Sequence, residues 1–347
     1  MAEARRIVYP DADDQLAALL TGARRTRLEA LGAFRIHHGL PGGLPGDPAA
    51  YLERLGDAAG VVLGWDLPVE VMRRAPRLEV ISYLGTGAAN FVDLAEAERL
   101  GITVCNTPGY GDNAVAEHAL ALLLALARRV PRLDHGLRQA GRQPERQAGQ
   151  RAGQGAEWGQ SQPGFELRGK TLGLVGLGGI GARMAELARG LGMEVKTWTR
   201  NPSPERAERH GVAFLPLEEL LETSDVISLH LLLTPETEGF LGPEELDRMK
   251  PDAVLVNTAR AELVDQAALV ERLRDGRIAA AGLDVFWNEP LPADHPLLEL
   301  DNVVLTPHVA YNTPEAIAAM LDIAIDNLAR YFEGGPINVV VGPRREA

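Results

Sequence analysis

Four polar side chains able to do chemistry follow apolar runs in the C-terminal part of the sequence. The runs are residues 253–257, 278–284 and 302–306, and each has the length and composition of a buried strand. The side chains at the ends of these runs, or just after them, are Arg260, Asp284, Glu289 and His308. Because the carboxyl ends of parallel strands meet at one edge of a sheet, we expect these side chains to converge there.

An arginine, a histidine and a carboxylate at one sheet edge are suited to hydride transfer at a 2-oxo acid. A guanidinium binds a carboxylate through paired hydrogen bonds and polarises the neighbouring carbonyl. A histidine gives a proton as the hydride arrives, and a carboxylate on its second nitrogen fixes the tautomer and favours the imidazolium. Taken singly, Arg260 could form a strand-end salt bridge and His308 could be an ordinary loop histidine, so the inference depends on the set.

A glycine-rich run, residues 171–181, predicts a nucleotide site. An apolar stretch leads into Gly176-x-Gly178-x-x-Gly181, and a helical pattern over residues 182–191 follows. The first glycine permits the tight turn, the second lets a pyrophosphate approach the backbone, and the third lets the helix pack closely on the strand. In this strand–turn–helix context the pattern predicts dinucleotide binding, with a plain turn as the alternative.

The end of the next predicted strand, residues 194–199, bears on the choice between NAD and NADP. NAD-dependent sites of this kind place an acidic residue there to bind the adenosine ribose. Here the positions hold Thr199, Arg200 and Asn201, without a carboxylate. A neutral side chain followed by a cation favours a 2′-phosphate, so we expect NADP to be accepted and lean toward it over NAD. In the alternative, Arg200 points to solvent and NAD suffices.

The order of these motifs predicts an α/β protein with two Rossmann-like or flavodoxin-like domains, each with a parallel sheet. Short strands alternate with helices in the first hundred residues, and the alternation restarts at Gly169. We therefore expect a substrate domain formed by residues 1–106 and 312–347 and a dinucleotide-binding domain formed by residues 107–311. The active site is expected in the cleft between them.

Three segments between the strands have distinctive patterns. A helical pattern covers residues 16–31, and a long amphipathic helix is predicted over residues 113–139, long enough to cross between domains or subunits. Residues 141–161 are rich in Gln, Gly and Arg and have no periodicity, which predicts a mobile surface loop, with a lid over a cleft as the alternative.

Composition argues against several other classes of function. With 347 residues, a formal net charge of −13 and a pI near 5.2, the chain is not expected to bind nucleic acid or an anionic membrane. Cys105, its single cysteine, suits a reducing compartment, and the first ten residues lack a signal-peptide pattern. We expect a cytoplasmic protein that acts on a small molecule, and we predict no metal site because no acidic or cysteine cluster suggests one.

The ordered Arg, Glu and His residues and the motifs around them resemble the D-isomer-specific 2-hydroxyacid dehydrogenases. The matching segments cover most of the chain: Gly85-Thr86-Gly87, Asn106-Thr107-Pro108-Gly109, Val115-Ala116-Glu117-His118, the glycine motif, Asn257-Thr258-Ala259-Arg260, Leu283-Asp284-Val285-Phe286 through Glu289-Pro290, and Thr306-Pro307-His308. This chain departs from the family in having Ala261 where glycine is usual, and residues 141–160 look longer than usual.

The resemblance implies an NAD(P)-dependent 2-hydroxyacid dehydrogenase that runs as a 2-oxoacid reductase and forms a homodimer through the long helix. It implies that Arg260 binds and polarises the substrate, that His308 is the acid/base and that Glu289 supports His308. Binding of the substrate carboxylate is implied for backbone groups of Leu84, Gly85, Thr86 and Gly87. Cofactor contacts are implied for Val115, Gly179, Ile180, Thr258 and, on the nicotinamide side, Asp284.

Other functions stay open on the same residues. The fold also serves corepressors that sense the nucleotide, and an NADP-dependent reductase of a non-acid carbonyl is a further alternative. Glu289 argues against a formate dehydrogenase, in which glutamine typically supports the histidine. The residues do not choose among glyoxylate, hydroxypyruvate, a phosphorylated acid, a phosphonate and a larger 2-oxo acid. Packing is the expected task of His118 and of the nearby aromatics, which are Tyr83, Trp287 and Tyr311.

Overall fold

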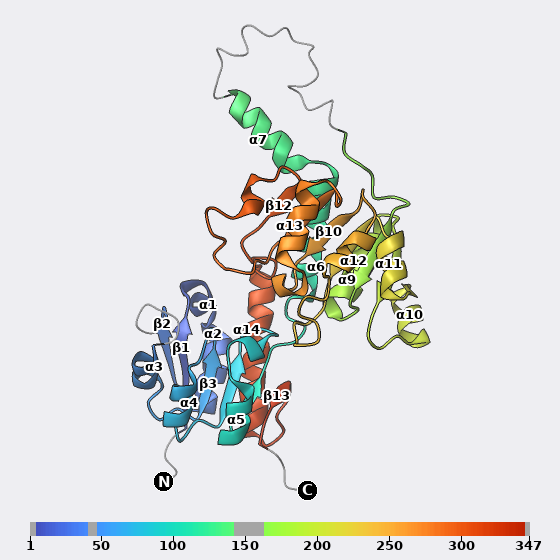
Figure 1. Cartoon of the computed structure of the whole chain (residues 1–347). Coiled ribbons are helices and arrows are strands. Elements are labelled where there is room, and N and C mark those ends of the chain that lie inside the picture. The colour runs from blue at the N-terminus through green and yellow to red at the C-terminus, as the bar shows by residue number, and fades with distance from the viewer. Residues whose placement is uncertain (1–4, 41–46, 142–162, 344–347) are drawn as a thin grey trace. The chain divides into compact units, whose positions relative to one another are not determined.

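The computed structural model describes residues 5–40, 47–141 and 163–343, and the chain divides into two compact units (Figure 1). Unit 1 comprises Met1–Gly111 and Asn312–Ala347, and unit 2 comprises Asp112–Tyr311. The first boundary follows Gly111 instead of residue 106. One reason is that Thr107 belongs to unit 1, where its backbone N–H donates to the Gly85 carbonyl oxygen at 3.0 Å.

Unit 1 is built on a six-stranded sheet with the order β13-β5-β4-β3-β1-β2. Its strands are β1 (Arg6–Ala12), β2 (Ala33–His38), β3 (Gly60–Leu63), β4 (Val80–Tyr83), β5 (Thr103–Cys105) and β13 (Val339–Val341). Neighbouring strands are parallel except at one edge, where β13 pairs antiparallel with β5. The predicted parallel sheet is therefore confirmed in unit 1 for five of the six strands, and β13 adds an antiparallel strand at one edge.

Helices cover both faces of this sheet. They are α1 (Asp14–Leu19), α2 (Gly22–Leu31), α3 (Pro48–Leu55), α4 (Val69–Arg74), α5 (Leu94–Leu100) and α14 (Pro314–Phe332). Alternation along β1 sets the two layers, because Ile7 and Tyr9 pack in the cluster that contains α14 while Val8 packs in the cluster of α3 and α4. The single helix predicted over residues 16–31 is wrong, since the chain turns at Gly22, whose φ is +53°.

Unit 2 is built on seven parallel strands in the order β12-β11-β10-β9-β6-β7-β8. The strands are β6 (Thr171–Val175), β7 (Glu194–Trp198), β8 (Ala213–Phe214), β9 (Val226–Leu229), β10 (Val254–Asn257), β11 (Ala280–Leu283) and β12 (Val303–Leu305). The chain begins in the middle of the sheet at β6 and extends it first to one side and then to the other. This is the doubly wound order of a dinucleotide-binding sheet.

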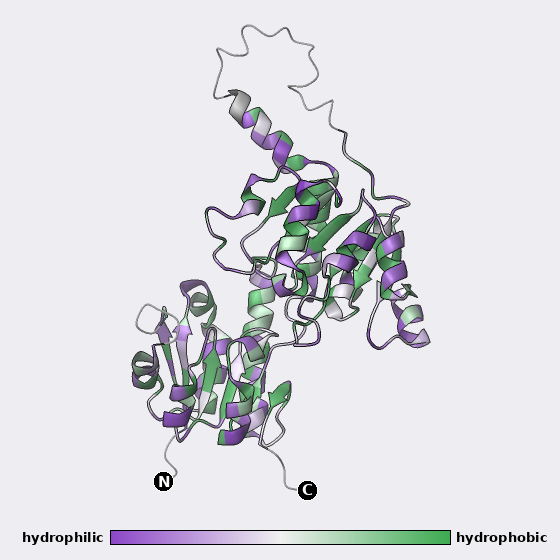
Figure 2. Cartoon of the chain, viewed as in Figure 1, coloured by the Kyte–Doolittle hydropathy of each residue, from purple (hydrophilic) through white to green (hydrophobic). Residues whose placement is uncertain are grey.

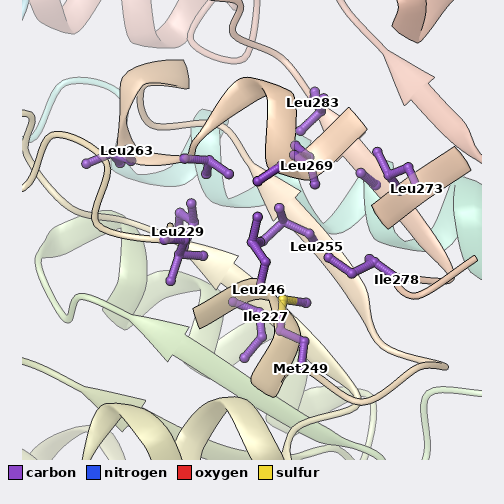
Figure 3. Packing of buried hydrophobic residues seen from close by; sticks show 14 of the residues in the cluster. Ile227, Leu229, Leu246, Met249, Leu255, Leu263, Leu269, Leu273, Ile278 and Leu283 are labelled. Atoms are coloured by element: carbon purple, nitrogen blue, oxygen red, sulfur yellow. The ribbon is translucent and has the colours of Figure 1, made fainter. Parts of the chain in front are cut away.

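Helices pack on both faces of the unit 2 sheet, with α6 (Asp112–Ala127) and α9 (Gly179–Gly190) on one face and α11 (Leu217–Thr223), α12 (Pro243–Arg248) and α13 (Gln266–Arg274) on the other. Figure 3 shows Leu255 of β10 close to Leu246 of α12 and Leu269 of α13. Its neighbours Val254 and Val256 join the cluster of the opposite face. Buried on both faces, the central strands are hydrophobic along their length (Figure 2).

The long helix predicted over residues 113–139 is wrong in one respect, because it is two helices. Helix α6 ends at Ala127, and α7 (Val130–Gly141) begins after Arg129, whose φ is +54°. The physical reason is Pro131, which has no N–H to give to a helical hydrogen bond and clashes with the preceding turn. The predicted loop over residues 141–161 lies, after Gly141, outside the described residues.

Candidate active site

The edge of the unit 2 sheet collects three of the four predicted side chains from adjacent strands. Strands β10, β11 and β12 are neighbours, and their carboxyl ends lie at the same edge because they are parallel. Arg260 comes three residues after β10, Asp284 directly follows β11, and His308 comes three residues after β12. The strand order thus brings together residues that are far apart in the sequence.

The fourth side chain, Glu289, is paired with His308. The Nδ1 atom of His308 lies 2.8 Å from Oε2 of Glu289, and Oε1 of Glu289 accepts a hydrogen bond of 3.0 Å from the Phe286 backbone N–H. An ionised carboxylate only accepts hydrogen bonds, so His308 carries a proton on Nδ1 and leaves Nε2 for a proton transfer. Both side chains are 37% exposed, which leaves the ring within reach of a ligand.

The backbone at His308 has a left-handed conformation that needs support. Its φ is +53°, an uncommon value for a residue other than glycine. The His308 N–H donates to the Asp284 carbonyl oxygen at 2.7 Å. The Asp284 carboxylate accepts hydrogen bonds from the N–H groups of Val309 and Ala310, at 3.0 and 2.8 Å, and from Oγ1 of Thr306, at 2.6 Å. The carbonyl oxygen and the carboxylate of Asp284 therefore together hold the loop formed by residues 306–310.

The charge state of Asp284 follows from its burial and its hydrogen bonds. Burial raises the pKa of this carboxyl group, but hydrogen bonds from His118, Thr306, Val309 and Ala310 outweigh that effect and lower the pKa below its ordinary value. The side chain is fully buried and ionised beneath the loop. Its oxygens accept hydrogen bonds from protein groups of the His308 loop, and its implied contact with the nicotinamide stays a prediction.

Arg260 is held by the turn that follows β10. The Asn257 side chain accepts a hydrogen bond from the Ala259 N–H at 3.0 Å and donates one to the Arg260 carbonyl oxygen at 2.8 Å. The Arg260 guanidinium donates only to the Ala259 carbonyl, and no carboxylate pairs with it within the described residues. Ala261 is buried and its φ is not positive, so the glycine that is usual in the family is not required.

The glycine motif forms the predicted turn between β6 and α9. Gly176 has a φ of +104°, and a Cβ there would lie 2.5 Å from the His230 carbonyl oxygen. A Cβ on Gly178 would meet no atom within 4 Å, so this backbone is open to a ligand, whereas Gly181 packs against Gly176. Burial lowers the pKa of His230 to about 4, which keeps that side chain neutral below the turn. Backbone amides and the α9 dipole therefore supply the attraction for a pyrophosphate.

The other predicted cofactor residues have varied surroundings. Ile180 is partly buried against the cluster of α6 and α9, and Val115 is buried on α6. The carboxylate of Asp112 occupies the space next to Gly179 that a side chain would need. Oγ1 of Thr258 is buried and has no hydrogen-bond partner among the described residues, which suits a group that completes its bonding with a ligand. The open Gly178 and the orphan hydroxyl fit a dinucleotide.

Arg206, near the predicted binding site of the adenosine ribose, was not predicted from the sequence. Arg206 donates hydrogen bonds of 2.6 Å to the carbonyl oxygens of Leu177, in the glycine turn, and Asn201, after β7. It lies in the first turn of α10 (Pro204–His210), which Ser203 caps by accepting from the Arg206 N–H. The only sequence signal near this position is the Ser203-Pro204 pair, which is typical of a helix start.

Thr199 is partly buried, whereas Arg200 and Asn201 are exposed. The pKa of Glu236 is lowered by a hydrogen bond with Thr234 and further by the positive charge of Arg200. Glu236 is itself exposed and forms no ion pair with Arg200 within the described residues.

In unit 1, the predicted substrate loop follows β4. Gly85 has a φ of +152°, and a Cβ there would press on the Tyr83 ring. The N–H of Leu84 donates to the Leu63 carbonyl oxygen, and that of Gly85 donates to Oγ1 of Thr107 at 2.9 Å. These two N–H groups are thus used within the protein, whereas those of Thr86 and Gly87 donate to no described atom. Binding of the substrate carboxylate by residues 84–87 stays a prediction, and the backbone N–H groups of Thr86 and Gly87 are the two that the protein leaves available for it.

Asp11, near the end of β1, organises the neighbouring turn of unit 1. Its carboxylate accepts hydrogen bonds from the N–H groups of Gly64 and Trp65, at 3.1 and 2.7 Å, and from the Tyr51 hydroxyl at 3.3 Å. Burial raises the pKa of Asp11 to about 6, although these hydrogen bonds oppose the shift. The sequence offered no sign of this buried acid beyond its place in an apolar strand.

We expect Asp11 to make stability depend on pH. Its pKa is about 6 in the folded chain and near 3.8 when exposed, so the folded state holds the proton more tightly. The favourable contribution is complete below pH 3.8 and is lost as the pH rises through 6, by up to about 3 kcal/mol. Urea unfolding of the wild type and of Asp11→Asn between pH 4.5 and 7.5 measures it. A difference between the two that stays constant with pH would contradict the assignment.

Two further features of the described residues concern metal ions and membranes. No group of three or more His, Cys, Asp or Glu side chains there could hold a metal ion. None of the helices in that part of the chain is long and apolar enough to cross a membrane.

Comparison with known proteins agrees with the geometry. The family described as "D-isomer specific 2-hydroxyacid dehydrogenase, NAD binding domain" matches residues 120–310. A glyoxylate reductase of Korarchaeum cryptofilum is 40% identical over 85% of this chain and 86% of its own length. A hydroxypyruvate reductase of Blautia hydrogenotrophica is 35% identical over 85% and 88%. The structure of an NADPH-dependent glyoxylate/hydroxypyruvate reductase of Sinorhizobium meliloti, in complex with NADP and malonate, matches with a TM-score of 0.78, 31% identity and coverage of 99% and 100%.

Fold and site together define an oxidoreductase with a Rossmann-type sheet that uses NAD or NADP. Within that class, the chain belongs to the D-isomer-specific 2-hydroxyacid dehydrogenases. The predicted fold class, family and cofactor type are confirmed. The roles of single residues and the predicted cleft between the domains stay predictions.

Proposed function

We propose that this dehydrogenase reduces glyoxylate or hydroxypyruvate to the corresponding 2-hydroxy acid, with Arg260, Glu289 and His308 as its catalytic residues. The observation that carries the proposal is the 2.8 Å pair between Nδ1 of His308 and Glu289, at the same sheet edge as Arg260. Relatives named for these two reductions are 35–40% identical over most of the chain.

Each residue has one task in the reduction. When bound, the reduced nicotinamide supplies the hydride that adds to the carbonyl carbon. Arg260 binds the substrate carboxylate and polarises the carbonyl with N–H groups that no described carboxylate occupies. His308 gives the proton on Nε2 to the carbonyl oxygen, and Glu289 holds Nδ1–H and balances the positive charge of the ring. The amides of Thr86 and Gly87 are proposed as a second anchor for the carboxylate.

The test is the decay of nicotinamide absorbance with purified protein, glyoxylate, hydroxypyruvate and their phosphorylated or phosphonate analogues. Turnover of the free acids, lost when the carboxylate is esterified, is the expected result. An ester that turns over as fast as the acid would point to a non-acid carbonyl instead. Tight cofactor binding without turnover on any 2-oxo acid would favour a nucleotide sensor.

For the cofactor, we propose that NADP is preferred over NAD. Two cations support this: Arg200, exposed directly after Thr199, and Arg206, whose guanidinium spans the glycine turn and Asn201. No acidic residue stands at the end of β7 to bind an unphosphorylated ribose and repel a phosphate.

Replacing Arg200 with alanine is expected to raise the Kd of NADPH about tenfold and leave that of NADH within about twofold, because one charge-assisted hydrogen bond to phosphate is lost. Nucleotide fluorescence titrations measure both constants. The control is Arg209→Ala, which removes an equal charge from the last turn of α10. Equal losses for NADPH and NADH in Arg200→Ala would end the phosphate assignment.

A homodimer in the cytoplasm is also proposed. Helix α7 supports the dimer, because Val130 and Leu137 on it are 56% and 57% exposed and Leu133 lies between them at helical spacing. Sedimentation velocity of the purified chain measures its oligomeric state.

A further inference from the structure

Helix α6 packs close to β11. Gly282 makes this possible, because a Cβ at that position would lie 3.0 Å from Cβ of Leu122 and 3.3 Å from Leu126. His118 lies four residues before Leu122 and therefore on the same helix face, one turn nearer the carboxyl ends of the strands. The close packing brings its ring to the base of the His308 loop, where the side chain is 23% exposed.

A directed chain of hydrogen bonds starts at this ring. Nε2 of His118 lies 2.9 Å from Oγ1 of Thr306, and the Thr306 hydroxyl donates to Oδ1 of Asp284 at 2.6 Å. Asp284 is ionised and only accepts, so the single hydroxyl proton of Thr306 is committed to it. Thr306 must then accept from His118, which fixes the proton of the imidazole on Nε2. His118 Nε2 is also 3.5 Å from Oδ1 of Asp284.

The chain ends at the residue proposed to donate the proton. Asp284 holds the N–H groups of Val309 and Ala310 with its carboxylate and the N–H of His308 with its carbonyl oxygen. These bonds hold His308 in its left-handed conformation, with φ of +53°. If the Asp284 carboxylate lost its contacts with Thr306 and His118, it would be free to rotate. The N–H groups of Val309 and Ala310 would then lose their common acceptor.

We propose that His118 is a positioning residue for His308, acting as an Nε2–H donor through Thr306 and Asp284. His118 is not among the expected site residues, and packing was its expected role. The expected effect of His118 on turnover rests on the proposed role of His308. The expected effect of His118 on the His308 loop does not depend on any activity.

Three substitutions separate hydrogen bonding from packing. His118→Gln keeps an N–H donor near the position of Nε2, His118→Asn places its amide near the position of Nδ1, and His118→Ala removes both. Thr306→Val is the partner variant, since it keeps the shape of the side chain without the hydroxyl. The control for loss of a histidine is His210→Ala, in the last turn of α10.

Two measurements are made on each variant: hydrogen–deuterium exchange of the peptide that covers residues 306–311, and turnover of glyoxylate with saturating cofactor. We expect faster exchange and a kcat about tenfold lower for His118→Ala, His118→Asn and Thr306→Val, with wild-type-like values for His118→Gln and His210→Ala. The double variant His118→Ala/Thr306→Val should lose no more than either single one, because both break the same chain.

The proposal is overturned by wild-type exchange and kcat in His118→Ala, or by a His118→Gln variant that is as impaired as His118→Ala, since packing would then be the cause. If the wild type turns over no 2-oxo acid, the proposed function fails, and the exchange measurements still decide the role of His118. Thermal unfolding of each variant identifies one that has not folded, and in that case Thr306→Val decides on the same two readouts.

Discussion

Substituting asparagine for His308 should lower kcat for glyoxylate by about 10²–10⁴-fold, the usual contribution of a positioned acid or base. Asparagine tolerates the left-handed backbone found here, with φ of +53°, so the loop should keep its shape. Its amide can keep the hydrogen bond that Nδ1 makes with Glu289, but it gives up no proton. Stopped-flow or steady-state absorbance measures kcat, and titration with NADPH should show a Kd within about twofold of the wild type.

Glu289→Gln is the matched variant for this test. It keeps a side chain that can accept from the Phe286 N–H, but it replaces the carboxylate that faces Nδ1 of His308. A smaller loss than in His308→Asn is expected, because the ring is still present although its tautomer is no longer fixed. Wild-type kcat in His308→Asn would remove this histidine from the mechanism, whatever the result for Glu289.

The second large effect is expected from Arg260→Lys, with kcat/KM for glyoxylate falling by about 10²–10⁴-fold. Lysine keeps the positive charge but loses the planar fork, and two charge-assisted hydrogen bonds of about 1.5–3 kcal/mol each are at stake. The turn itself should survive, because Asn257 bonds to backbone groups of Ala259 and Arg260 and not to the guanidinium. Steady-state kinetics over a range of glyoxylate concentrations measure the loss.

A control and a rescue sharpen this experiment. Arg248→Lys, in the last turn of α12, makes the same exchange where the guanidinium pairs with Glu222 at 2.9 Å, and it should not change kinetics. Adding guanidinium ion to Arg260→Ala should restore part of the activity if the fork binds the carboxylate. Unchanged kcat/KM in Arg260→Lys would show that charge alone, or another residue, holds the substrate.

Much of the fold was predictable because it depends on local patterns. The central strands of unit 2 are mostly apolar runs, and Gly176 and Gly181 stand where a turn and a close helix contact require them. Pro131 also carried enough information to predict the break between α6 and α7. By contrast, β13 is three residues long and pairs with β5 from the far end of the chain, and no local pattern indicates such a contact.

The site was predictable in its residue types but not in its hydrogen bonds. Strand ends predict that Arg260 and His308 share an edge, whereas the direction of each side chain depends on tertiary packing. Asp284 illustrates the limit, since only the structure shows that its carboxylate faces the His308 loop. Arg206 and His118 were missed for the same reason: their partners are main-chain or hydroxyl groups distant in sequence.

The many bonds that Asp284 makes to the His308 loop limit how this enzyme can be redesigned. In a saturation library over residues 306–310, most members would lose the shared acceptor geometry and so lose turnover on every substrate alike. Laboratory evolution toward a new 2-oxo acid would then recover mainly wild-type codons from that segment. Substitutions in residues 306–310 would therefore add inactive variants without changing substrate preference. Useful substitutions have to be made at residues that are not hydrogen-bonded to Asp284.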